Sequence, residues 1–246
     1  MMVRLIGWIA AALLCPAALA MADEVVPRET LHADIERTYE SLTTAAAAGS
    51  RFAVSVDLGG DNFALAHDAA AGRLQVLYRM NFNQVAEGWS WQPQANPAQA
   101  DYYRYKFLPL GSRERPQGAP YVQEDLPGRP RQVQRIWHYD YFFAFDNPYD
   151  FFPRPTVEDD AGFTADIPLA AAQARELMQP GRIGMLAWAR WVEPKQAEST
   201  TFWKATDGKP VDLTLKNRYL IGKLEEIWFV DSADGRVLAK LVPSRR

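Results

Sequence analysis

The residues best suited to acid–base chemistry lie in and just after the segment Gln132 to Phe145. His138 and Asp140 are two positions apart, so in an extended strand they share a face and can touch. Asp150 follows shortly after. An imidazole with such carboxylates could hydrolyse a glycan or a peptide. The competing interpretation, a polar strand face beside an aromatic one, is favoured because no G-x-S-x-G or S-x-x-K nucleophile motif follows residue 22.

Metal ligation is not indicated by the spacing of the remaining histidines and acids. The three histidines (His32, His67 and His138) show no H-x-x-x-H spacing. Acids gather near Asp57, near Asp146 and at 158–160, without the spacing of a calcium loop. We therefore expect neither a metal site nor a cofactor.

Aromatic side chains are the most suggestive candidates for ligand binding. Rings beside polar groups can stack on sugars or anchor a protein partner, where Trp, Tyr and Arg dominate. The candidates are Trp89, Trp91, Tyr103, Arg104, Trp137 and Tyr139. The alternative, that tryptophans fill a core, is favoured for Trp188, Trp203 and Trp228, which lie in strand patterns. For Trp89 and Trp91, in a Gly/Gln/Pro/Asn-rich stretch, the two interpretations are balanced.

The first 22 residues predict a cleavable signal peptide. An apolar run from Leu5 to Leu14 is too short to cross a bilayer, and Ala20-Met21-Ala22 offers a cleavage site, with Ala18-Leu19-Ala20 as the alternative. Cleavage would remove Cys15, the single cysteine, and shift the net charge from −3 to −4 by removing Arg4. This predicts a periplasmic protein, with further export as the alternative, that has no stable membrane insertion. The acidity argues against nucleic-acid binding.

Hydrophobic periodicity predicts two principal helices, at about 28–48 and 167–178, among many strands. Strands are expected at 52–58, 63–67, 74–80, 102–108, 132–145 and 183–192, and in a C-terminal meander of 200–205, 211–215, 219–230 and 236–242. Because strands and helices do not alternate, the expected class is α+β, mostly antiparallel sheet, without a doubly wound parallel core.

Residues 23–246 are expected to form one α+β domain. Between Pro109 and Pro130, five prolines and three glycines predict a long surface loop, because proline cannot donate to a sheet. This Pro/Gly/Arg-rich segment, 109–131, is where a subdivision of the domain would fall.

One resemblance accompanies these patterns. It is carried by Phe145-Asp146-Asn147-Pro148-Tyr149-Asp150-Phe151-Phe152-Pro153, an Ala-rich helix ending at Glu176-Leu177, and the hairpin at 219–242. Over about residues 140–242 the chain resembles secreted bacterial proteins that carry a domain of unknown function. The resemblance implies an exported bacterial domain and no activity.

Three functions remain open on the sequence. The first is an exported, non-enzymatic binding or accessory protein of the bacterial envelope, whose ligand is a protein or an envelope glycan. The second is an envelope glycan or peptide hydrolase that uses His138, Asp140 and Asp150. The third is a structural subunit of an envelope assembly.

Overall fold

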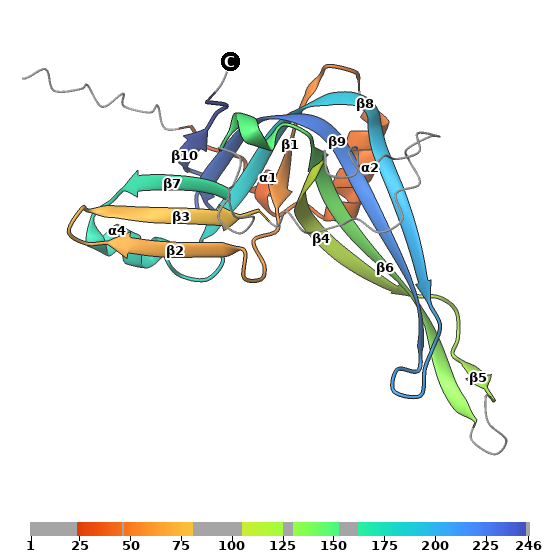
Figure 1. Ribbon diagram of the computed structural model, residues 1–246. Coiled ribbons are helices and arrows are strands. Elements are labelled where there is room, and N and C mark those ends of the chain that lie inside the picture. The colour runs from red at the N-terminus through yellow and green to blue at the C-terminus, as the bar shows by residue number, and fades with distance from the viewer. Residues whose placement is uncertain (1–23, 46, 81–104, 125–129, 153–161, 245–246) are drawn as a thin grey trace, which may run out of the picture.

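The computed structural model describes residues 24–45, 47–80, 105–124, 130–152 and 162–244. The predicted signal peptide and the candidates Trp89, Trp91, Tyr103 and Arg104 lie outside these ranges. Within them the fold is α+β, dominated by strands, as the sequence predicts (Figure 1).

Two sheets carry the fold. The large sheet has the strand order β1-β8-β9-β6-β4, with β10 added to β9 and β5 added to β6. Its strands are β1 (Arg51–Val56), β4 (Lys106–Pro116), β5 (Tyr121–Gln123), β6 (Arg131–Phe145), β8 (Ile183–Trp203), β9 (Val211–Asp231) and β10 (Val237–Leu241). The small sheet has the order β2-β3-β7, from β2 (Phe63–Asp68), β3 (Arg73–Arg79) and β7 (Gly162–Pro168).

The predicted C-terminal meander is confirmed, since β8, β9 and β10 are antiparallel neighbours. Between the expected strands 200–205 and 211–215 the sequence has Asp207-Gly208, a pair typical of tight turns, and a bridge between Thr206 and Lys209 closes the β8–β9 hairpin there. One pairing was not expected: β6 and β9 run parallel, from Gln134 beside Val211 to Ala144 beside Ile221. Turn signals reveal antiparallel neighbours, but no local turn joins these two strands.

In the described residues two helices of seven or more residues occur, as predicted, but both are shorter than the sequence suggested. The first region is split into α1 (Arg28–Leu31) and α2 (Ile35–Ala45). The break falls at Asp34, whose Oδ1 accepts the Arg37 backbone N–H at 3.1 Å, as an N-cap does. The second helix, α4 (Ala171–Leu177), begins after β7, so Asp166 and Pro168 belong to a strand.

The prediction of a loop over 109–130 is wrong for the described part of that segment. Pro109 and Pro116 lie in β4, and β5 adds a second strand. Among the described strands, β4 is the edge of the large sheet, where a proline costs no hydrogen bond to an outer neighbour. The register shifts between Pro109 and Gly111, and Gly111 has φ +133°. The division of the domain near 109–131 stays a prediction.

The largest buried apolar cluster lies between one face of the large sheet and the elements that cover it, and two smaller clusters lie around Tyr219 and around Trp228 in the described residues. On β6 the odd positions Tyr139, Tyr141, Phe143 and Phe145 belong to the largest cluster and are all buried. The Tyr39 ring of α2 packs edge-on against Tyr141 at 5.4 Å. Phe163 of β7 packs against Phe145 on the same face. The helix and the small sheet therefore cover one face of the large sheet together.

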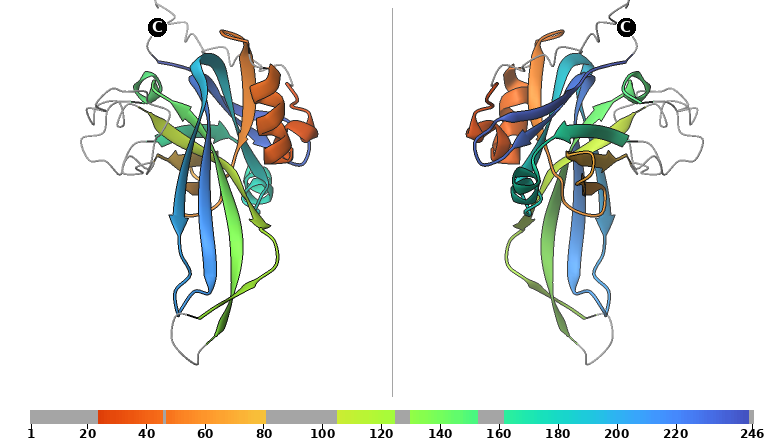
Figure 2. Two further views of the ribbon diagram at one scale, coloured as in Figure 1. Left: turned by 90° about the vertical axis from the view of Figure 1, so that its right-hand side faces the viewer. Right: turned by 90° about the vertical axis from the view of Figure 1, so that its left-hand side faces the viewer.

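Four strands continue beyond this sandwich to a narrow tip (Figures 1 and 2). We call this projection the blade and define it as residues 111–116, 131–141, 196–203 and 211–218. It is the platform on which the main candidate side chains lie.

Candidate functional site

The register of the blade brings cations of β9 onto the aromatic face of β6. Tyr139 lies beside Lys216, and Tyr141 lies beside Arg218. The Lys216 ammonium nitrogen is 3.8 Å from the Trp137 ring centroid and 5.6 Å from that of Tyr139. Rings and cations thus alternate along one face. We call Trp137, Tyr139, Tyr141, Lys216 and Arg218 the cation–π stack.

At the inner end of the cation–π stack, Arg218 already interacts with other side chains of the protein. The Arg218 guanidinium lies 4.7 Å from the Tyr139 ring centroid and donates to the Tyr141 hydroxyl at 3.4 Å. Its Nε is 3.1 Å from a Glu198 carboxylate oxygen. Burial lowers the pKa of Arg218, but Tyr141 and Glu198 outweigh it, so the pKa stays raised and the charge is permanent. This end stabilises the β6–β9 pair.

The outer end is open. Exposure increases along β6 from fully buried Tyr141 to half-buried Trp137. In the part of the chain that the structure describes, no carboxylate lies within ion-pair distance of the Lys216 ammonium. Its N–H donors can therefore take an anionic oxygen while the neighbouring ring offers an apolar surface.

Other cations on this face differ in how far they are neutralised. Arg113 and Arg115 of β4 form ion pairs with Asp34 and Glu36 of the α2 region. Arg135 instead stacks on Tyr121, 4.6 Å from its centroid. Arg135 also lies beside Asp212 of β9 and helps to lower the pKa of that carboxyl, so its charge is partly balanced.

The predicted contact between His138 and Asp140 is present on the opposite face. His138 Nε2 is 3.0 Å from Asp140 Oδ1, and Nδ1 is 2.9 Å from Glu114 Oε1 of β4. Burial lowers the pKa of His138, but these two hydrogen bonds outweigh it and raise the pKa above its ordinary value. Because each ring nitrogen faces a carboxylate, neither is free to accept a substrate proton.

The structure does not bring Asp150 to this pair. Asp150 lies in the 3₁₀ helix η1 (Pro148–Asp150), where it accepts a hydrogen bond from Asn147 at 3.1 Å. Asp140 and the end of β6 at Phe145 are separated by about 16 Å of strand. Among the described residues no group of three potential metal ligands is gathered anywhere.

Two of the predicted ligand-binding residues, Trp137 and Tyr139, are neighbours with ring centroids 6.3 Å apart. Lys216 and Arg218 were not among the candidates from the sequence. Their alternation with Leu215 and Asn217 nevertheless placed both on one strand face.

The tryptophans predicted to be core differ from one another. Trp228 is buried, as predicted, whereas Trp188 is half-buried and its ring lies tilted against that of Trp228, with centroids 5.0 Å apart. Trp203 is 46% exposed, so its core assignment was wrong. It lies at the end of β8, where the blade narrows.

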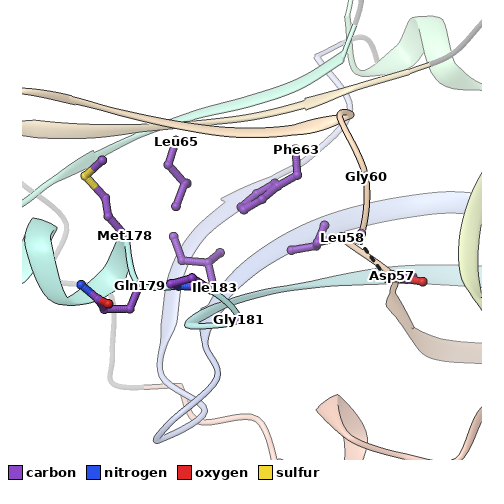
Figure 3. A pocket seen from close by; sticks show the side chains of 11 residues that line it. Asp57, Leu58, Gly60, Phe63, Leu65, Met178, Gln179, Gly181 and Ile183 are labelled. Atoms are coloured by element: carbon purple, nitrogen blue, oxygen red, sulfur yellow. Dashed lines mark hydrogen bonds between the residues drawn. The ribbon is translucent and has the colours of Figure 1, made fainter.

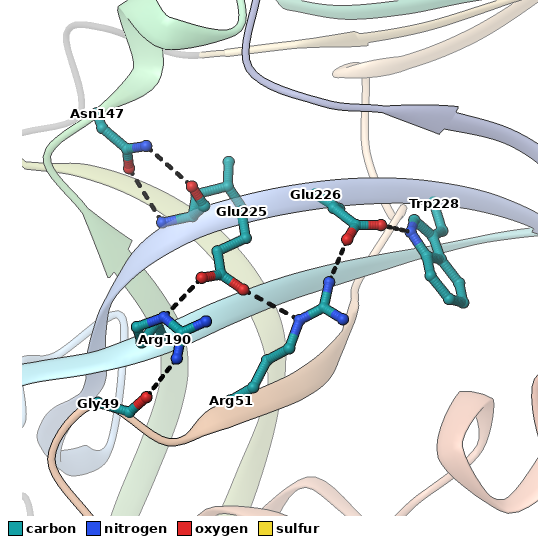
Figure 4. Close-up of polar contacts among 8 residues, drawn as sticks. Gly49, Arg51, Asn147, Arg190, Glu225, Glu226 and Trp228 are labelled. Carbon is teal, nitrogen blue, oxygen red and sulfur yellow. Dashed lines mark hydrogen bonds and ion pairs between the residues drawn. The ribbon is translucent and has the colours of Figure 1, made fainter. Parts of the chain in front are cut away.

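A second charged cluster is structural (Figure 4). Arg51 and Arg190 both pair with Glu225, at 3.0 and 2.7 Å, and Arg51 also pairs with Glu226. The β8–β9 register shifts at these glutamates, between the pairs Trp188–Glu226 and Ala189–Leu224. The arginines therefore hold a bulge in place and neutralise its two carboxylates.

Comparison of the chain with protein-family models, with curated proteins and with solved structures gives no match. None of the helices in the described residues is long and apolar enough to cross a membrane. The function therefore has to be argued from the site.

Proposed function

We propose that the protein is an exported binding protein, without catalysis of its own, that holds an anionic glycan of the bacterial envelope on its blade. One observation carries the proposal: the Lys216 ammonium lies 3.8 Å over Trp137 and has no carboxylate partner among the described residues. A bare cation beside a half-buried ring is suited to a ligand that has both an anionic group and an apolar face.

A glycan satisfies both requirements. The C–H face of a sugar ring packs on an aromatic side chain, and a carboxylate or phosphate on the same sugar takes a charge-assisted hydrogen bond from Lys216. Arg135 adds a second cation farther toward the tip. A chain of charged sugars could contact both positions, which supports a polymer over a small molecule.

Export to the periplasm belongs to the proposal and rests on the segment 1–22. The engagement of both His138 nitrogens supports binding over the hydrolase alternative. The resemblance of residues 140–242 to secreted bacterial proteins stays a prediction.

Binding is tested with two glycans that differ in charge. Peptidoglycan strands freed of peptides carry lactyl carboxylates, whereas chitotetraose has similar rings without charge. We expect calorimetric titration to show binding of the strands and much weaker binding of chitotetraose. Lys216→Gln should reduce affinity for the strands about fivefold to tenfold, the equivalent of about 1–1.4 kcal/mol.

The matched control is Lys209→Gln, because Lys209 is an exposed lysine in the β8–β9 turn. This variant should bind as the unaltered protein does. Equal binding of charged and uncharged glycans, or equal loss in both variants, would refute the proposal.

The structural-subunit alternative is favoured by one observation on β8. Beyond Arg190, the described strands leave the outer edge of β8 unpaired over 196–203. The opposite edge, β4, is interrupted by prolines and a bulge, which discourage strand addition. Light scattering during size exclusion separates the functions: a monomer that binds glycan supports the first, and a defined oligomer supports the second.

A further inference from the structure

We propose a second binding site, distant from the blade, that takes an amphipathic cation such as an aliphatic amine. It is a hollow of about 650 Å³ where the small sheet meets the start of β8. Its volume is within the range of small-molecule sites in proteins. No residue that lines it belongs to the blade, so this inference stands independently of the proposed function.

Four neighbouring parts of the described chain form the walls. The β1–β2 loop contributes Leu58, and β2 contributes Phe63 and Leu65. The turn after α4 contributes Met178, and β8 contributes Ile183. Figure 3 shows Leu58, Phe63, Leu65 and Ile183 facing one space, with Met178 at its edge.

The apolar surface of the hollow is reachable from solvent. Met178 is 42% exposed, which makes it one of the most exposed large apolar side chains in the described part of the chain. Leu58, Phe63 and Leu65 are only half-buried although they adjoin the core. An alkyl chain that covered them would be stabilised by the apolar surface that it removes from water.

The charge at the rim selects the head group of the ligand. Among the described residues that line the hollow, Asp57 is the charged one, and it lies at the end opposite Met178 (Figure 3). Its Oδ1 accepts the Gly59 N–H at 2.9 Å, and its own N–H donates to the Pro109 carbonyl at 2.8 Å, so its backbone position is fixed.

Arg182, which lies in the chain between the lining residues Gly181 and Ile183, does not neutralise the Asp57 carboxylate. Arg182 donates two hydrogen bonds to Asp231, at 2.6 and 2.9 Å, and is therefore engaged elsewhere. The hollow consequently combines an apolar interior with one negative charge. This combination favours an ammonium head group over a neutral one and disfavours a carboxylate.

Titration with octylamine, octanol and octanoate tests the head-group preference, because the three share one alkyl chain. Binding to the full mature chain is followed by calorimetry near neutral pH. We expect octylamine to bind about fivefold more tightly than octanol, as one ion pair near water contributes about 1 kcal/mol. Octanoate should bind most weakly.

Two variants and one control distinguish the effect of the charge from that of the apolar surface. Asp57→Asn keeps an oxygen for the Gly59 N–H and should make octylamine and octanol equal, whereas Asp61→Asn, in the same loop but outside the hollow, should change nothing. Met178→Lys, at an exposed position, should reduce octylamine binding at least tenfold. Equal affinity for the amine and the carboxylate, or unchanged selectivity in Asp57→Asn, would overturn the inference.

Discussion

Phe163 is the side chain through which β7 joins the two sheets, so its truncation tests the architecture. The ring is 1% exposed and lies 6.4 Å from Phe145, 5.7 Å from Phe151 and 5.4 Å from Phe152, centroid to centroid. Phe→Ala at a buried position costs about 3–5 kcal/mol, a range that already includes the loss of such aromatic contacts. We expect Phe163→Ala to lower the free energy of unfolding by about 4 kcal/mol.

Urea denaturation followed by circular dichroism measures this loss. With a slope of about 2.5 kcal/mol per molar urea for a chain of this size, the midpoint should fall by about 1.5 M with the slope unchanged. Phe163→Leu should lose about half as much, because it refills part of the cavity.

Thr164→Ala is the matched control on the same strand, since Thr164 points to the exposed side of the small sheet. It should shift the midpoint by less than 0.2 M, an effect of about 0.5 kcal/mol. If Phe163→Ala cost no more than Thr164→Ala, the small sheet would not be packed on the large sheet as described.

The remaining predictions concern close packing and pH. Gly222→Ala should cost about 1–3 kcal/mol in the same assay, because a Cβ would lie 2.9 Å from the Arg190 carbonyl oxygen, whereas Gly208→Ala, in open space, should be neutral. Because the pKa of His138 is raised in the folded state, its contribution to stability is full below pH 6.5 and is lost as the pH rises through the folded pKa. His138→Gln should abolish this pH dependence of the free energy of unfolding, measured by urea titration at several pH values. An unchanged pH dependence in the variant would contradict the stabilising role of the protonated His138.

Alternation of residue types and turn residues in the sequence identified the strands that have one regularly patterned face and the hairpins that join them. The polar and aromatic faces expected for 132–145 are present on β6, and the structure shows the aromatic face buried at Tyr141 and Phe143. Asp207-Gly208 marked the β8–β9 turn. Beyond Trp191 the alternation is disrupted where the register shifts, so the second half of β8 was not recognised as the same strand.

The position of a strand within the sheet, at an edge or in the centre, could not be inferred from local sequence patterns. Pro109 and Pro116 are compatible with β4 because β4 is an edge strand, and that depends on which strands pair. The same limit applies to the sites. His138 and Asp140 could be paired from the sequence because they are two residues apart, whereas Glu114 reaches them through the β4–β6 register.

The cation–π stack shows this limit most clearly. Trp137 and Tyr139 were recognisable as candidates from their place in an aromatic strand. Lys216 is more than 70 residues away in the chain and reaches them through a parallel pairing that no turn encodes. The charge that completes the candidate site was therefore not evident from the sequence.

Glycan binding at the blade is tested most directly by the indole N–H resonance of Trp137, assigned with Trp137→Phe, during titration with peptide-free peptidoglycan strands. The account predicts that this resonance shifts saturably, that buried Trp228 stays unchanged, and that Lys216→Gln weakens the response about fivefold to tenfold. Binding that leaves the Trp137 resonance in place, or no binding at all, would contradict it.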